Sequence, residues 1–229
     1  MISKLLSLFI VLLSLGQTTI EGYVDQMSLG GNLFLINRDF RISADYVPSD
    51  LVKPSVKHNS DAILMREEAA HALEELFAAA KEEEGYTLIA VSGYRSYGTQ
   101  KTIYNRKVKS VGEKKANLTV ALPGASEHQL GLAMDITCKS VKHLSGGFGN
   151  QPEGQWVAEN CWRFGFIIRY KAEWTDTTGY SYEPWHIRYV GKEHAERIWQ
   201  MDIPLEDYVA LLCEARQALV SSDSPQYEE

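Results

Sequence analysis

The sequence predicts an α+β fold, in which helices are set around short strands. Segments with helical periodicity and short apolar segments follow one another without the regular strand–helix–strand alternation of a parallel sheet. The chain has 229 residues, of which 45% are hydrophobic and 23% charged. This is enough for one sizeable domain with its own core, and we see no internal repeat.

Residues 1–16 have the pattern of a secretory signal. Lys4 precedes a run of apolar or small residues that extends to Gly16, and a full membrane span needs about 20 apolar residues. We therefore expect a signal peptide and a secreted or cell-envelope protein. An uncleaved short anchor is the main alternative, and a cytosolic hydrophobic arm is a third. Residues 17–32 are polar and contain glycine, so we expect a linker before the domain.

The domain is expected over residues 33–219, and its first half contains two strands and two helices. The helix over Met65–Glu84 is predicted by apolar residues at steps of three and four, and Gly85 ends it. Thr87–Val91 is rich in β-branched residues and predicts a buried strand. Leu33–Ile36 is a further strand-like run, and Gln100–Lys109 has helical composition.

The second half continues the same pattern. The glycine-rich stretch Gly146–Asn150 predicts a lid or turn, which we favour over an anion cradle because no strand-to-helix phosphate fingerprint surrounds it. We expect helices over Gln155–Phe164, Lys192–Gln200 and Leu205–Leu219, a strand over Phe166–Ile168, and a disordered tail over 220–229.

Charge and cysteine content exclude several classes of partner. The net charge of −7 and the pI near 5.4 give no basic footprint for nucleic acid, and we assign the basic residues of 106–115 to a solvated surface. None of the three cysteines belongs to a C-x-x-C pair, so we expect buried, unpaired thiols. A disulfide between Cys138 and Cys161 is the alternative outside the cell.

Two residue types that bind metals lie close together in Ser126–Asp135. This stretch contains His128 and Asp135, and Gly131 argues against one continuous helix, so we expect a loop that enters a buried strand. His186 supplies a third candidate ligand. Two histidines and one carboxylate leave a fourth tetrahedral position for water, which is the pattern of a catalytic rather than a structural zinc site. We therefore expect Zn²⁺, although neighbouring divalent metals accept the same ligands.

Glu183 is the candidate base beside this metal. Pro184 disfavours helical geometry at Glu183, so His186 can hold the metal while Glu183 reaches the water. Zinc lowers the pKa of water and polarises a carbonyl, and Glu183 would pass the water's proton to the leaving amine. The pattern predicts amide hydrolysis. The alternative is that His128, Asp135 and His186 are buried residues satisfied by ordinary hydrogen bonds.

Arg95 follows a predicted strand and a glycine. Its planar guanidinium could bind a carboxylate through two parallel hydrogen bonds, but spacing alone favours a surface salt bridge. Gln100 and Ser126 are ambiguous by themselves, and Ser126 is not a credible nucleophile because no G-x-S-x-G turn surrounds it. Trp185 and Tyr182 could line a pocket or simply pack.

With these residues identified, residues 33–212 resemble the VanY-type D-alanyl-D-alanine carboxypeptidases. The resemblance depends on three motifs in the same order along the chain, which are Ser92–Ser96 with Gln100, the series Ser126, His128, Gly131, Ala133 and Asp135, and Glu183–His186. It implies a single zinc-peptidase domain with a small central antiparallel sheet flanked by helices, consistent with the α+β class.

The resemblance also implies roles for individual residues. His128, Asp135 and His186 would bind zinc and Glu183 would be the catalytic base. Arg95 would bind the free carboxylate at the C-terminus of the substrate, assisted by Gln100 and Ser126. The implied substrate is the peptidoglycan stem peptide outside the membrane. We expect a monomer that contacts the membrane only if the N-terminal segment is an uncleaved anchor.

Three alternatives remain for the activity. The leading expectation is D,D-carboxypeptidase activity, which removes the terminal D-Ala from stem pentapeptides. An L,D-carboxypeptidase would act on tetrapeptides, and a zinc-containing peptidoglycan-binding module would cleave neither. The intact Glu183 argues against the binding module. A hydrolase with a Ser or Cys nucleophile would resist chelators, whereas a zinc enzyme would not.

Overall fold

The structure is a computed structural model, which describes residues 17–222. The predicted signal peptide or anchor over 1–16 lies outside the described residues, as do residues 223–229 of the predicted tail. Among the described helices, none combines the length and the apolar character that crossing a membrane requires.

The centre of the molecule is a four-stranded antiparallel sheet in the order β3-β4-β6-β5. Its strands are β3 (Leu88–Ser92), β4 (Ala133–Cys138), β5 (Phe166–Tyr170) and β6 (Glu183–Tyr189). A separate two-stranded sheet joins β1 (Leu51–Val52) to β2 (Met65–Arg66), so the predicted long helix begins two residues later than expected. The α+β class with a small antiparallel sheet is confirmed.

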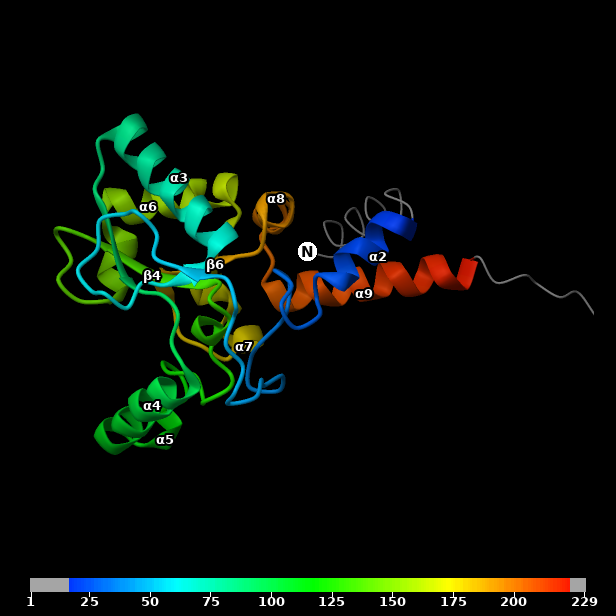
Figure 1. Ribbon diagram of the computed structural model, residues 1–229, viewed down its shortest axis with the longest axis horizontal. Helices are drawn as coiled ribbons and strands as arrows, with labels where there is room; N and C mark the ends of the chain where they lie inside the picture. Colours follow the sequence, from blue (N-terminus) through cyan, green and yellow to red (C-terminus); the bar gives the residue numbers. More distant parts are fainter. Residues whose placement is uncertain (1–16, 223–229) are drawn as a thin grey trace, which may run out of the picture.

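Helices surround this sheet in the part of the chain that the structure describes (Figure 1). They are α2 (Gln17–Asp25), α3 (Glu67–Glu84), α4 (Tyr97–Val111), α5 (Glu113–Ala116), α6 (Pro152–Asn160), α7 (Thr175–Thr178), α8 (Lys192–Met201) and α9 (Leu205–Ser222). Short 3-10 turns are η1 (Glu127–Leu130), η2 (Gly146–Asn150), η3 (Cys161–Phe164) and η4 (Ala172–Trp174). The glycine-rich stretch is therefore a compact turn, and the predicted helix over Gln155–Phe164 is divided between α6 and η3.

One face of the sheet is apolar and packs against α3 and α6. Met134 and Ile136 of β4 and Ile187 of β6 are fully buried on this face, in one cluster with Leu73 and Leu76 of α3. Burying each such side chain stabilises the fold by about 1.5–3 kcal/mol. Because side chains alternate along a strand, the residues between them in β4 and β6 lie on the opposite face, where the polar site is built.

A second apolar core joins the two ends of the described chain. Ile20 and Tyr23 of α2 are buried together with Tyr208 and Leu212 of α9, and the two helices lie side by side in Figure 1. The prediction of a linker over 17–32 is therefore wrong for α2. The few apolar residues of α2 do not form a clear helical periodicity in the sequence, but they are buried against the apolar surface of α9.

Three local predictions also differ from the structure. Leu33–Ile36 is not a strand, although Leu33 and Ile36 are fully buried. Its backbone carbonyl at Phe34 accepts a hydrogen bond from the Arg188 side chain instead of pairing in a sheet. The helix α9 continues to Ser222, so the prediction of a disordered tail is wrong for residues 220–222. All three cysteines are unpaired, and the alternative of a disulfide is not realised.

Candidate active site

The three predicted metal ligands converge on the polar face of the sheet. The antiparallel register places Asp135 of β4 directly opposite His186 of β6, and directly opposed residues share one face. His128 reaches them from the turn η1, which ends at Gly131 with φ 69°. One ligand atom from each residue lies within 4.8 Å of the others, and all three side chains are buried.

The ring of His128 is fixed by a backbone carbonyl. Its Nδ1 lies 2.8 Å from the carbonyl oxygen of Gly93. Since a carbonyl only accepts, Nδ1 carries the proton and Nε2 keeps its lone pair, 3.4 Å from Oδ2 of Asp135. A side chain at Gly93 would place a Cβ 2.3 Å from the carbonyl oxygen of Leu64, so glycine permits the close approach of this segment.

The ring of His186 is fixed by a carboxylate and uses the other nitrogen toward the metal position. Its Nε2 lies 3.0 Å from Oε2 of Glu127, and its Nδ1 lies 3.2 Å from Oδ1 of Asp135. Donation from Nε2 to Glu127 leaves the lone pair of Nδ1 free. A carboxylate in this position orients a histidine ligand and raises its basicity. The two histidines thus present Nε2 and Nδ1 respectively.

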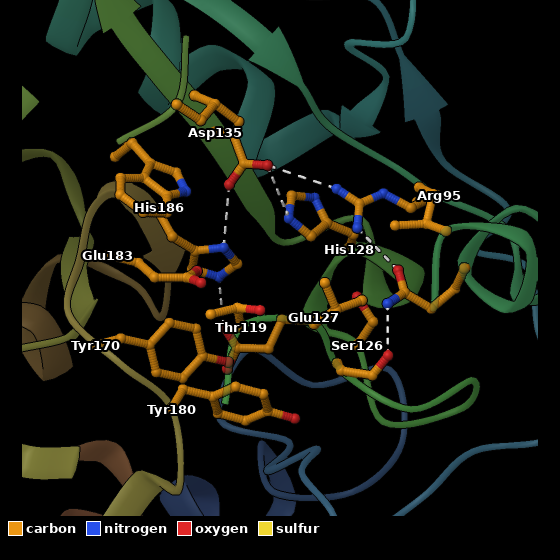
Figure 2. Close-up of a pocket in the computed structure, with 16 residues that line it drawn as sticks. Arg95, Thr119, Ser126, Glu127, His128, Asp135, Tyr170, Tyr180, Glu183 and His186 are labelled. Atoms are coloured by element: carbon orange, nitrogen blue, oxygen red, sulfur yellow. Dashed lines mark hydrogen bonds and ion pairs between the residues drawn. The ribbon is translucent and has the colours of Figure 1, made fainter. Parts of the chain in front are cut away.

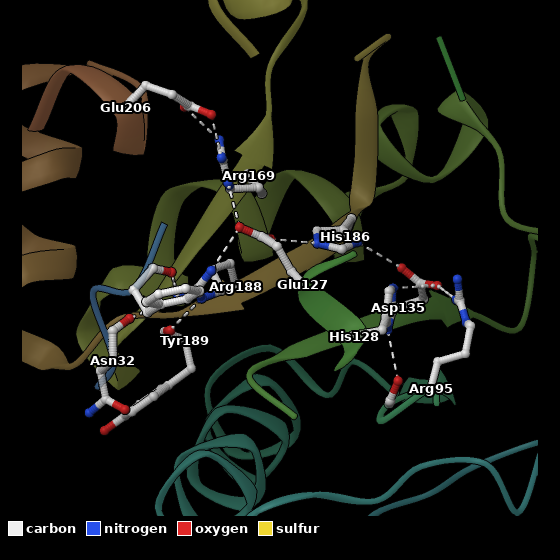
Figure 3. Close-up of polar contacts among 12 residues, drawn as sticks. Asn32, Arg95, Glu127, His128, Asp135, Arg169, His186, Arg188, Tyr189 and Glu206 are labelled. Atoms are coloured by element: carbon white, nitrogen blue, oxygen red, sulfur yellow. Dashed lines mark hydrogen bonds and ion pairs between the residues drawn. The ribbon is translucent and has the colours of Figure 1, made fainter. Parts of the chain in front are cut away.

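Glu127 is the centre of a buried charge network (Figure 3). Its Oε1 accepts from Nε of Arg169 at 2.7 Å and from Nη1 of Arg188 at 2.8 Å. Arg169 continues the network to Glu206 of α9 through two bonds of 2.9 and 2.6 Å. Burial alone would raise the pKa of Glu127, but the two guanidinium groups and His186 lower it well below its ordinary value.

The role of this network was not predicted from the sequence. Glu127 immediately precedes a candidate histidine ligand, and metal-binding histidines regularly donate their second N–H to a carboxylate. That adjacency was an available signal, although it could not indicate that Glu127 serves His186 rather than its neighbour. Arg169 and Arg188 lie in apolar strands, where a buried arginine implies a buried carboxylate.

The donor set fits a tetrahedral zinc ion. Zinc bonds of about 2.0–2.1 Å separate neighbouring ligand atoms by about 3.3 Å, and the nitrogen–oxygen distances here are 3.4 Å for His128 and 3.2 Å for His186. Burial disfavours a charged His186, but Asp135 and Glu127 outweigh it and raise the pKa of His186 to about 9. The two carboxylates therefore stabilise positive charge at this position, which zinc would supply in place of a proton on Nδ1.

Glu183 lies in the same cleft as the three ligands (Figure 2). The pairing of β5 with β6 shifts register between Ile168 and Tyr170, so Glu183 pairs with Tyr170. This irregularity allows Glu183 and His186 to line one cleft, although residues three apart in a regular strand face opposite sides. Burial raises the pKa of Glu183 to about 7, aided by Asp135 and opposed by His186 and Arg95.

Arg95 is held at the cleft wall by three side chains. Its Nη1 donates to Oε1 of Gln100 at 2.8 Å, and its Nη2 lies 3.1 Å from Oγ of Ser92 and 3.5 Å from Oδ2 of Asp135. Only 16% of the Arg95 side chain is exposed. The interpretation of Arg95 as a surface salt bridge is therefore wrong, because its carboxylate partner is buried in the site.

Gln100 and Ser126 both line the cleft, but only Gln100 contacts Arg95. Gln100 uses its oxygen to accept from Arg95 and its nitrogen to donate to the carbonyl of Ala121 at 2.7 Å, so it orients Arg95. Ser126 is buried and lines the cleft. Trp185 also lines the cleft, whereas Tyr182 is 42% exposed and lies outside the lining.

The sequence matches one family model and several curated proteins. The model, described as VanY: D-alanyl-D-alanine carboxypeptidase, matches residues 62–192. The putative carboxypeptidase YodJ of Bacillus subtilis is 49% identical over 181 residues, 77% of this chain and 66% of that protein. A D-alanyl-D-alanine carboxypeptidase of Enterococcus faecium is 35% identical over 208 residues, 86% of this chain and 64% of that protein. The chain thus spans just under two thirds of these relatives.

Solved structures show the same fold at high identity. The LdcB LD-carboxypeptidase is 48% identical with a TM-score of 0.73, covering 77% of this chain and 84% of that one. VanYB in complex with D-alanine-D-alanine is 37% identical with a TM-score of 0.67, covering 78% and 97%. A variant of the D,D-pentapeptidase VanY in complex with Zn(II) is 36% identical with a TM-score of 0.66, covering 78% and 98%.

Proposed function

We propose that this chain, which belongs to the VanY family of D-alanyl-D-alanine carboxypeptidases, is a zinc-dependent carboxypeptidase that removes the terminal D-Ala from peptidoglycan stem peptides. The observation that carries this proposal is the convergence of His128, Asp135, His186 and Glu183 in one cleft. A related VanY binds Zn(II), and the ligand spacing here fits the same ion.

His128, Asp135 and His186 would hold the zinc ion, which when bound supplies a Lewis acid for the scissile carbonyl and lowers the pKa of water. Glu183 takes the proton of the attacking water on its carboxylate. The same carboxyl then gives that proton to the leaving amine nitrogen. A pKa near neutrality suits this exchange, because a general base must accept and release a proton at the working pH.

Arg95 would bind the free carboxylate at the substrate's C-terminus. Its guanidinium is held in place by Gln100 and Ser92, and it lines the same cleft as Glu183. A cation at this buried position accepts a chain end but not a continuing peptide. The position of Arg95 therefore supports an exopeptidase, and Ser126 lines the same wall.

Two bonds are candidates for cleavage. The resemblance of the sequence motifs to the VanY-type enzymes favours the D,D bond of pentapeptides, in agreement with the description of the family model. The comparison with solved structures favours the L,D bond of tetrapeptides, because identity and TM-score are higher for the LD-carboxypeptidase than for VanYB. We therefore propose L,D cleavage as the second candidate. We also propose that the enzyme acts outside the cytoplasm, where this substrate lies.

Mass spectrometry of defined stem peptides tests both candidates. The zinc-loaded protein is incubated with a pentapeptide and with a tetrapeptide, beside a chelated sample and the Glu183→Gln variant. Loss of one alanine from the pentapeptide supports D,D cleavage, and loss from the tetrapeptide supports L,D cleavage. If neither peptide changes, the protein is a peptidoglycan-binding module instead.

A further inference from the structure

The segment comprising α4 and α5, residues 97–116, carries a charge opposite to that of the rest of the chain. We call this segment the α4–α5 arm. It contains six basic residues and one acidic residue, a net charge of +5, whereas the whole chain carries −7, so the remainder carries −12. Such segregation produces a local positive field that attracts anions to one place on an otherwise acidic protein.

The basic side chains of the arm have no carboxylate partners among the described residues. Nine basic side chains elsewhere in residues 17–222 pair with an acid within 4.0 Å. None of the six in the arm does, and five are exposed, which are Lys101, Arg106, Lys109, Lys114 and Lys115. Their charge is therefore available to a ligand.

The arm forms one wall of the candidate active site. Gln100 and Ile103 of α4 line the cleft, the chain returns to the lining at Thr119 just after the arm, and Figure 1 shows α4 and α5 standing out from the sheet. Lys107 follows Ile103 by one helical turn, so both lie on the same side of α4. The positive charge of Lys107 also acts on Glu183 and helps to lower its pKa.

We propose that the α4–α5 arm, with Lys107 at its cleft side, binds free carboxylates on the substrate residues that precede the terminal D-Ala. This inference rests on the proposed function. The terminal carboxylate is assigned to Arg95, whose side chain is mostly buried, so the preceding residues must leave through the open side of the cleft. Lys107 is half-buried, one helical turn from Ile103 of the cleft lining, and its cation is complementary to an acidic stem peptide.

A matched pair of peptides tests this assignment. Both have the same sequence and the same free C-terminus, but in one the carboxylates that precede the terminal D-Ala are free and in the other they are amidated. We expect the wild type to prefer the acidic peptide. Lys107→Gln should lower kcat/KM for that peptide about fivefold, the effect of losing about 1 kcal/mol of ion pairing, and change the amidated peptide less than twofold. Lys57→Gln, an exposed lysine outside the cleft, is the control.

Other outcomes overturn the proposal. Equal loss on both peptides, or a wild type without preference, would show that Lys107 does not recognise substrate carboxylates. A triple variant, Arg106→Gln, Lys109→Gln and Lys114→Gln, is also tested for binding to whole cell-wall preparations in the presence of a soluble phosphate polymer. If that polymer displaces the wild type while the peptide preference is absent, the arm binds phosphate polymers instead.

A calorimetric titration separates this inference from the proposed function. The two peptides are titrated into Glu183→Gln protein, which keeps the cleft but lacks the base. Tighter binding of the acidic peptide supports the arm's role even if the wild type cleaves neither peptide. Cleavage of both peptides with equal affinity would leave the proposed function standing and overturn this inference.

Discussion

Glu127 is fully buried and Glu183 half-buried, both line the same cleft as His186, and the surroundings of the two carboxylates differ. Glu127 accepts hydrogen bonds from two arginines and from the histidine, which keep it ionised. The carboxylate of Glu183 makes no hydrogen bond among the described residues, and burial raises its pKa to about 7. Two glutamates in one cleft therefore have different roles. The ionised Glu127 orients His186, and Glu183, with a pKa near neutrality, can exchange a proton.

Removing the metal is expected to have the largest effect. Chelation should abolish hydrolysis, because neither carboxylate can replace the ion that activates the substrate carbonyl. Activity measured after chelation and again after addition of Zn²⁺ checks this. Full activity in the chelated sample, with metal content verified as zero, would mean that Glu183 works without zinc and that the assignment of the metal site is wrong.

Glu183→Gln should have the next largest effect. Loss of a general base costs about 10²–10⁴ in rate, and the amide of glutamine cannot take a proton from water. Zinc affinity should stay within threefold, because Glu183 is not among the three ligands. Single-turnover rates and metal titration measure the two quantities. Glu173→Gln, at an exposed position outside the cleft lining, is the matched control and should keep full activity.

Glu127→Gln should instead weaken the metal and the fold. Loss of an outer carboxylate typically costs about 10–100-fold in metal affinity, and leaving two buried arginines without it costs about 3–5 kcal/mol of stability. Metal competition and thermal unfolding measure these effects. Glu206→Gln removes a carboxylate from the same Arg169 without touching His186, so it should lower Tm but leave metal affinity within threefold. Equal losses of affinity in both variants would contradict the role of Glu127 in orienting the histidine.

Activity and stability should depend on pH in different acid ranges, because activity depends on Glu183 and stability on Glu127. Glu183 must be ionised to act, so kcat/KM should fall about tenfold per pH unit below its pKa. This fall in kcat/KM should begin at or below pH 7, because a bound metal cation would favour the ionised form of Glu183. The folded-state pKa of Glu127 is depressed, so its stabilisation is present above about 4.3, its unfolded value, and is lost as pH falls further.

Rate profiles and melting temperatures over pH 4–9 test this separation. Activity should decline while Tm is still constant. If Tm and kcat/KM fell together across the whole acid range, the loss of activity would reflect unfolding rather than protonation of Glu183.

Much of the candidate site was predictable from the sequence because its ligands stand out from their surroundings. Asp135 is a carboxylate inside an apolar strand. His128 lies three residues before Gly131 and Glu183 directly precedes Pro184, and both of these residues interrupt helical spacing. The structure brings these residues and His186 into one cleft. The α+β class followed equally well from the periodicity of α3 and the short apolar strands.

The features that were not predicted depend on residues that are distant from one another in the sequence. Glu127 is 42 residues from Arg169 and 61 from Arg188, and no local pattern pairs them. Helix α2 has few apolar residues and becomes buried only against α9. Gln100 was assigned to the substrate, but its amide is occupied by Arg95 and a backbone carbonyl, which only the three-dimensional arrangement reveals.

The pair between Arg169 and Glu206 extends the catalytic unit beyond the region that the family model matches. That region ends at residue 192, whereas Glu206 lies on α9. A fragment cut at this boundary would retain every candidate ligand and yet leave Arg169 short of one counter-charge in the interior. The smallest stable unit is therefore expected to be larger than the segment that the family model matches, and C-terminal trimming into α9 should lower its stability.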